Sequence, residues 1–158
     1  MDNRTDTGFF RLLTDSYRRL LGTSLIPPDI AQCANEQEEQ EAAHWLYESA
    51  PFVLLAHNTA ADPIFVYGNL AAQRQFGYDW DELTRLPSRL SADTPDQDER
   101  RAFIESVTSK GYATGYRGVR IAKSGKKFWI ENATLWQLTD DNGHLRGLAA
   151  MVPTVVDL

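Results

Sequence analysis

Three strand-like segments near the end of the chain, joined by two short turns, constrain the fold more than any other feature. They are residues 114–122, 128–139 and 144–152, and they are rich in apolar side chains. The turns between them read KSGKK and DDNG, and the pair Asn142-Gly143 is typical of a β-hairpin. Connections this short join antiparallel neighbours, because parallel strands need a long crossover. We therefore predict an antiparallel meander.

Two more strand-like runs and a group of short helices precede this meander. Residues 52–57 (FVLLAH) and 64–69 (IFVYGN) flank the turn-rich loop NTAADP. Asn69 is expected to cap a short helix, and residues 96–109 carry the strongest helical pattern of this region. The order predicts an α+β fold, a five-stranded antiparallel sheet with short helices on one face.

The N-terminal region is predicted to be helical. Residues 7–21 carry an amphipathic stripe at spacings of three and four, with Thr7 as the expected cap and Gly22 as the stop. The stripe consists of Phe9, Leu13, Tyr17 and Leu20. It has two possible partners, the sheet of its own chain or a second subunit. We expect a homodimer through these helices, because little else of the chain is expected to cover this apolar area, and two-fold pairing is the commonest symmetry.

A second helix is expected from Asp29 to about Ser49, after a break at two prolines. Two predicted parts follow from this pattern. Residues 1–48 form a helical extension, and residues 49–158 form the α+β domain.

Composition excludes several classes of protein. The chain has 158 residues and a formal net charge of −6, with no large cluster of Lys or Arg, so nucleic-acid binding is not expected. Cys33 is the single cysteine, which excludes an intrachain disulfide. The sequence has no secretory signal pattern and no apolar run long enough to cross a bilayer. We expect a cytoplasmic protein that does not bind membranes.

Three segments of this sequence carry a family resemblance. LPSRLSA, YRGVRIAKSGKKFWIENATLW and APFVLLAH together resemble the MEKHLA family, a PAS-like module. That family occurs alone in bacteria and at the C-terminus of class III homeodomain–leucine zipper factors in plants. The hairpin KSGKKFW also resembles that of light-oxygen-voltage (LOV) PAS domains. The resemblance implies a PAS fold and a sensory or regulatory role.

LOV domains bind a flavin, and the resemblance can be followed residue by residue. It places Ser88 at the reactive cysteine and Arg89 at the arginine that reaches the flavin phosphate. Arg120 and Ile130 fall where two asparagines would read the flavin ring. A hydroxyl cannot form the sulfur adduct, and the polar edge of the ring would lack partners. The three histidines, at 44, 57 and 144, are too scattered for haem or a metal. We expect no cofactor.

Ser88 has a functional and a structural interpretation. A nucleophilic serine needs a base and an orienting acid, and no motif supplies them. The structural interpretation is that Ser88 caps a short helical turn while Leu86 and Leu90 pack inward. We favour this interpretation and expect no enzymatic activity.

The same resemblance implies that Arg89 and Arg120 both point into a cavity between sheet and helices. A buried arginine needs a partner, because an isolated buried charge is costly. That partner is either an internal carboxylate, Glu105 or Glu131, or the carboxylate or phosphate of a small ligand. We favour the internal pair.

Aromatic side chains and Asn132 complete the predicted site. Trp136 and Tyr67 lie in strand-like segments, where aromatic residues usually form core but also line apolar pockets. Asn132 lies among them and needs hydrogen bonds if it is buried. The candidate ligand-binding residues are Arg89, Arg120, Asn132, Ser88, Trp136 and Tyr67.

These observations lead to three hypotheses of function. The first is a non-enzymatic PAS-like sensory module that binds a small molecule, with an anion among the candidates. It signals through dimer or partner contacts, and its N-terminal helices shift between two states. The second is a pure protein-interaction module with a filled core. The third, ranked last, is a small enzyme built around Ser88 and Arg89.

Overall fold

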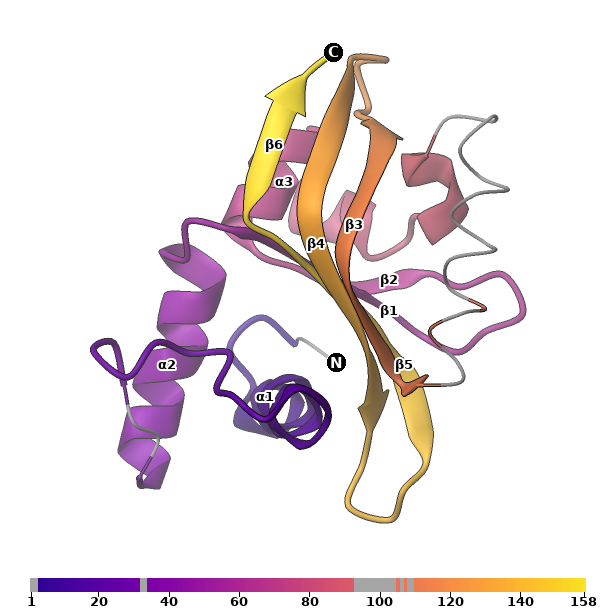
Figure 1. Cartoon of the computed structure of the whole chain (residues 1–158). Coiled ribbons are helices and arrows are strands. Elements are labelled where there is room, and N and C mark those ends of the chain that lie inside the picture. Colours follow the sequence, from indigo (N-terminus) through magenta and orange to yellow (C-terminus); the bar gives the residue numbers. More distant parts are fainter. Residues whose placement is uncertain (1–2, 32–33, 93–104, 106, 108–109) are drawn as a thin grey trace.

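A computed structural model describes residues 3–31, 34–92, 105, 107 and 110–158. Its centre is one antiparallel sheet in the order β2-β1-β5-β4-β3, with β6 also paired to β4 (Figure 1). The strands are β1 Val53–His57, β2 Phe65–Gly68, β3 Tyr112–Ile121, β4 Lys127–Thr139, β5 Leu145–Val152 and β6 Thr154–Asp157. The helices are α1 Thr7–Leu21, α2 Glu36–Glu48, α3 Leu70–Phe76, α4 Trp80–Leu83 and the 3₁₀ helix η1 Ser88–Ser91.

The predicted α+β class and antiparallel sheet are confirmed. The sheet has one more strand than predicted, because the chain continues past Pro153 as β6. β5 pairs with the C-terminal half of β4, and β6 pairs with its N-terminal half. The predicted helix at residues 96–109 lies mostly outside the described residues.

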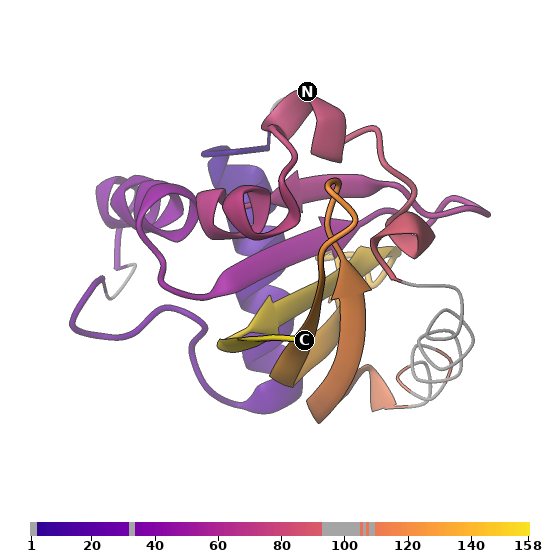
Figure 2. The same cartoon turned by 90° about the horizontal axis from the view of Figure 1, so that it is seen from above.

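Helices cover both faces of the sheet (Figures 1 and 2). We call the face under α1 and α2 the α1 face; its core includes Leu54, Tyr67, Trp136 and Leu138. We call the opposite face, under α3 and α4, the α3 face; its core includes Leu55, Phe65, Phe128 and Leu135. Neighbouring residues of β4, such as Leu135 and Trp136, therefore serve opposite cores.

The ends of the N-terminal helices follow from their capping residues. Asp6, one residue before the predicted cap, accepts a hydrogen bond from the backbone N–H of Phe9 at 2.9 Å. Gly22 ends α1 with φ 78°, in the left-handed region, as predicted. Helix α2 begins later than predicted, because Asn35 rather than Asp29 is its cap.

Helix α1 packs on its own sheet. Trp136 donates a hydrogen bond from its indole Nε1 to the carbonyl oxygen of Leu13 at 3.1 Å, and the ring of Tyr17 meets it edge-on at 4.9 Å. The hydroxyl of the fully buried Ser16 accepts from the N–H of Thr139 at 3.0 Å. The apolar stripe that motivated the dimer is thus covered within the chain, and the dimer stays a prediction.

Asn132 forms a β-bulge that changes which face each residue of β4 serves. It is exposed and has φ 57°, in the left-handed region. The pairing of β3 with β4 shifts by one residue here, between Gly118↔Ile130 and Tyr116↔Ala133. Before the bulge the even-numbered residues of β4 serve the α3 face, and after it the odd-numbered ones do.

We expect Asn132→Ala to destabilise the fold by about 1–2 kcal/mol, because an alanine Cβ is strained at positive φ. Asn132→Gly should stay within about 0.5 kcal/mol of the parent, since glycine adopts this conformation freely. Urea unfolding measures both. Asn142→Ala, at an exposed asparagine without positive φ, is the matched control. Equal effects of the alanine and glycine variants at position 132 would contradict this account.

Candidate functional site

A cavity of about 50 Å³ lies on the α3 face of the sheet. Such a volume accommodates a few water molecules or a very small organic molecule. Its lining is mostly apolar, with polar groups from Ser91 and Arg120 among others. The lining residues are Leu55, Ala56, His57, Phe65, Phe76, Ser91, Tyr116, Arg120, Ile130, Leu135, Leu148, Ala149, Ala150 and Val152.

The charged group of this cavity is the guanidinium of Arg120, which strand β3 directs to the cavity side of the sheet. Tyr116, Gly118 and Arg120 are all buried, and they point to the same face because side chains alternate along a strand. Arg120 donates from Nη2 to the hydroxyl of Tyr116 at 3.2 Å and from Nη1 to the carbonyl oxygen of Val119 at 2.8 Å. The guanidinium carbon lies 5.4 Å from the centre of the Tyr116 ring.

Gly118 makes this contact possible. A Cβ atom at this position would lie 2.7 Å from the Tyr116 hydroxyl oxygen and 3.1 Å from Nη1 of Arg120. A side chain here would therefore force the hydroxyl and the guanidinium away from their observed positions. The absent side chain lets residues four apart on β3 meet above the strand.

Neither carboxylate predicted as the internal partner of Arg120 pairs with it in the described part of the chain. Arg120 is only 5% exposed, yet within the described ranges no Asp or Glu forms an ion pair with it. Glu131 instead pairs with Arg117 at 2.7 Å, and Glu105 is exposed. Glu131 precedes the bulge, where the even-numbered residues of β4 serve the α3 face, so alternation along the strand puts its side chain on the face opposite Arg120.

Arg89 does not share the cavity with Arg120, so this part of the prediction is wrong. Its side chain is 51% exposed and pairs with Asp62 at 3.1 Å on the surface. The pair joins η1 to the loop between β1 and β2. Exposed pairs of this kind contribute little to stability, and Arg89 has a local partner rather than a ligand.

Ser88 is a buried structural residue next to the cavity wall. Its backbone N–H donates to the carbonyl oxygen of Pro63 at 2.8 Å, and its carbonyl oxygen accepts from the Ser91 hydroxyl at 2.6 Å. Ser91, rather than Ser88, lines the cavity. The expectation that Leu90 packs inward is wrong, because it is 42% exposed.

Trp136 and Tyr67 lie on the α1 face, across the sheet from the cavity. The prediction that they line the cavity is therefore wrong. Tyr67 stacks on Phe9 with ring centres 5.5 Å apart. Burial raises the pKa of the Tyr67 hydroxyl well above its usual value, since the phenolate would be desolvated. Asn132 is exposed at the bulge and also lies outside the cavity. The bulge decides which face of the sheet each β4 side chain occupies, and no pattern in the sequence predicts that bulge.

Sequence reasoning missed three residues that build the site: Ser91, Tyr116 and Gly118. A signal was present for the last two, because Tyr116, Gly118 and Arg120 follow the period of two expected for one face of a strand. Ser91 gave no such signal, since its position depends on the 3₁₀ turn of η1.

The residues present do not fit a flavin. A cavity of about 50 Å³ is far below the several hundred Å³ typical of cofactor sites. Arg89, at the position expected to reach the phosphate, is held on the surface by Asp62. Phe76 and Phe128 fill part of the interior, with ring centres 5.1 Å apart.

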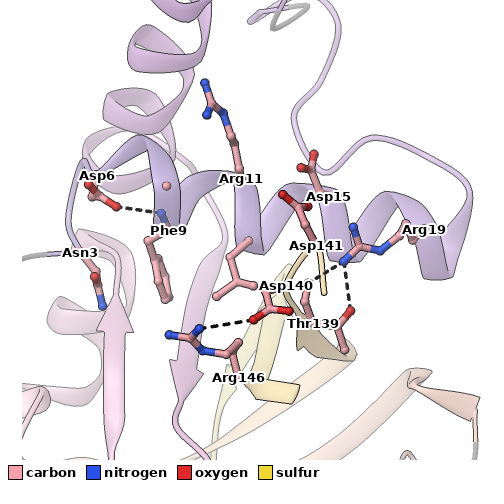
Figure 3. Close-up of a pocket in the computed structure, with 12 residues that line it drawn as sticks. Asn3, Asp6, Phe9, Arg11, Asp15, Arg19, Thr139, Asp140, Asp141 and Arg146 are labelled. Atoms are coloured by element: carbon pink, nitrogen blue, oxygen red, sulfur yellow. Dashed lines mark hydrogen bonds and ion pairs between the residues drawn. The ribbon is translucent and has the colours of Figure 1, made fainter. Parts of the chain in front are cut away.

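A second hollow lies between α1 and the β4–β5 hairpin, on the α1 side (Figure 3). This surface groove has a volume of about 380 Å³ and an apolar floor at Phe9 and Leu12. Its cations already have partners: Arg146 pairs with Asp140 at 3.4 Å, and Arg19 donates to the Thr139 carbonyl oxygen at 2.6 Å (Figure 3).

Asp140 organises the hairpin end of the groove. The N–H of His144 donates to its carboxylate and, with a second backbone N–H from Asn142, lowers the pKa of Asp140 below its usual value. These bonds hold the turn itself. The charged groups of the groove thus have partners within the chain. In the cavity, by contrast, the buried Arg120 has no carboxylate partner among the described residues, and we take the cavity as the candidate site.

Comparison with solved structures defines the class of fold. A PAS domain from Colwellia psychrerythraea matches with a TM-score of 0.59 and 17% identity, over 71% of this chain and 90% of that one. An RNA-binding light-oxygen-voltage receptor matches with a TM-score of 0.65 and 19% identity, over 80% of this chain and 35% of that one. The fold is that of a PAS domain.

The chain belongs to the MEKHLA domain family, whose model matches residues 7–156. The match crosses the predicted boundary between residues 48 and 49. The homeobox-leucine zipper protein ATHB-9 of Arabidopsis thaliana is 28% identical over 137 residues. These cover 84% of this chain but only 15% of that protein. No helix in the described part of the chain is long and apolar enough to cross a membrane.

Proposed function

We propose that this chain is a non-enzymatic sensory or regulatory module that binds a small molecule in the cavity on the α3 face. The observation that supports it most directly is a buried guanidinium, that of Arg120, in the wall of an otherwise largely apolar cavity. Preformed apolar pockets with a few convergent polar groups are the usual form of small-molecule sites. Membership of a family with a PAS fold agrees with this role.

The sheet offers a direct route from this cavity to helix α1. Leu135 lines the cavity, and the next residue, Trp136, packs against α1 and bonds to the carbonyl oxygen of Leu13. A ligand that binds one packing arrangement better than another shifts the population of the two. In this proposal α1 carries the change to a partner, either a second copy or another protein.

A second candidate is a protein-interaction module with a filled core. The small volume of the cavity and the Phe76–Phe128 packing favour it. In that case Arg120 is a structural residue, and its remaining donors are served by water.

Native mass spectrometry of the full chain, compared with the same protein after denaturation, tests the proposal. We expect a small molecule to be retained and then released. Ala150→Leu, which adds a side chain inside the cavity, should abolish retention, and Ala60→Leu on an exposed loop should not. Retention in Ala150→Leu would mean that the molecule binds elsewhere. If xenon also fails to shift the amide resonances of cavity residues, the filled-core module is correct.

A further inference from the structure

We infer that the molecule bound in this cavity is a small carboxylate of about three to five non-hydrogen atoms, held by the guanidinium of Arg120. This inference rests on the proposed function and specifies its ligand class. The contacts of Arg120, the size of the cavity and the chemistry of its lining carry it.

The first argument is charge. Arg120 is 5% exposed, and its two hydrogen-bond partners among the described residues are neutral, a backbone carbonyl oxygen and the Tyr116 hydroxyl. A buried cation without a counter-charge is costly, and arginine does not escape the cost by losing its proton. No carboxylate of the described ranges pairs with it, so a bound anion would supply the missing charge.

The second argument is geometry. A guanidinium has five N–H donors, and the contacts with Val119 and Tyr116 occupy two of them. The remaining donors belong to a planar fork, which matches the two oxygens of a carboxylate. Tyr116 and Gly118 act as positioning residues, because the hydroxyl fixes the fork and the glycine leaves room for their contact.

The third argument is size and polarity. A volume of about 50 Å³ corresponds to roughly three to five water-sized spheres. Most of the wall is aliphatic or aromatic and suits a short apolar remainder better than a second charged group. Its apolar members include Leu55, Phe65, Ile130, Leu135, Leu148 and Val152. Acetate and propionate match these requirements, whereas a phosphate ion has no apolar end.

Amide NMR titration of the full chain with sodium acetate tests the inference, with acetamide as the neutral probe of the same shape and inorganic phosphate as the competing anion. We expect saturable shifts in β3 with acetate, and an affinity for acetamide and phosphate at least tenfold lower. Arg120→Gln should weaken acetate binding at least tenfold. Arg117→Gln, on the opposite face of the same strand, should leave it unchanged.

Two further variants separate loss of the site from loss of the fold. Arg120→Lys keeps the charge but not the fork, and should bind acetate more weakly than the parent while remaining folded by circular dichroism. Gly118→Ala keeps the arginine but moves it and Tyr116, and should weaken binding likewise. If Arg120→Gln does not fold, these two variants decide the question.

The outcomes distinguish the inference from the proposed function. Equal binding of acetate and acetamide, tight phosphate binding, or acetate shifts that persist in the Arg120 variants would overturn the carboxylate class, while the cavity would remain a binding site if xenon enters it. If neither acetate nor xenon perturbs the cavity residues, the proposed function itself is wrong.

Discussion

Asn69→Ala is expected to lower the free energy of unfolding by about 4 kcal/mol, a large share of the 5–15 kcal/mol typical of a domain. Asn69 is fully buried, and its side chain joins three separate elements. Its Oδ1 accepts from the backbone N–H groups of Leu54 and Ala72, at 3.1 and 3.0 Å. Its Nδ2 donates to the carbonyl oxygens of Leu46 and Phe52, at 3.2 and 2.9 Å.

The size of this effect comes from what alanine leaves behind. Truncation removes the partner of four backbone groups, and each buried group without a partner costs about 1–3 kcal/mol. These groups lie at the end of α2, at β1 and at the start of α3, so no single local shift repairs them. Urea unfolding, followed by circular dichroism, measures the loss.

Two companion variants make the result specific. Asn35→Ala removes an exposed cap with one hydrogen bond and should cost about 1 kcal/mol. Asn69→Asp keeps the acceptor but places a carboxylate against two carbonyl oxygens. Burial raises the pKa of the introduced carboxyl above its unfolded value, so its neutral form is favoured. The variant should therefore gain stability relative to the parent as pH falls from 7 to 4. If both alanine variants lowered the free energy of unfolding by only about 1 kcal/mol, Asn69 would not be the residue that joins α2, β1 and α3.

Trp136→Ala is expected to cost about 3–5 kcal/mol, because the side chain is fully buried in the core of the α1 face. The loss should be accompanied by faster hydrogen exchange throughout α1, since this indole bonds to Leu13 and packs against Tyr17. Trp136→Phe retains an aromatic ring but loses the indole hydrogen bond to the Leu13 carbonyl oxygen, and should cost about 1–3 kcal/mol.

Trp45→Ala is the matched control for Trp136. Trp45 is only partly buried and meets Phe52 edge-on, with ring centres 6.1 Å apart. Trp45→Ala should lower the free energy of unfolding by less than Trp136→Ala does, and it should leave the hydrogen exchange rates of α1 unchanged. If Trp136→Ala instead abolished ligand retention at nearly unchanged stability, the residue would belong to the binding site and not to the support of α1.

The strands and turns of this protein were largely readable from its sequence. Short polar turns bearing glycine, as at Asn142-Gly143, leave adjacent strands no option but antiparallel pairing. Gly22 was recognised as the end of α1 because glycine adopts the left-handed conformation freely. Asn69 was recognised as the start of α3 because its side chain accepts a hydrogen bond from a nearby backbone N–H. Arg120 was expected to point into a cavity from the family resemblance alone; in the structure it is buried and lies in the cavity wall.

The tertiary structure decided which face of the sheet each side chain occupies and which partner each charge finds. One additional residue at the Asn132 bulge exchanges the two faces along β4, which puts Trp136 under α1. Arg89 and Arg120 were given the same prediction, yet they lie in different environments. Arg89 pairs with Asp62 at the surface. Arg120 is buried, where it bonds to Tyr116 beside Gly118. Hydrogen bonding within turns and caps depends on residues a few positions apart, so helix ends such as those at Gly22 and Asn69 could be predicted from the sequence. Face and pairing depend on the register between distant segments, which exists only once the chain has packed.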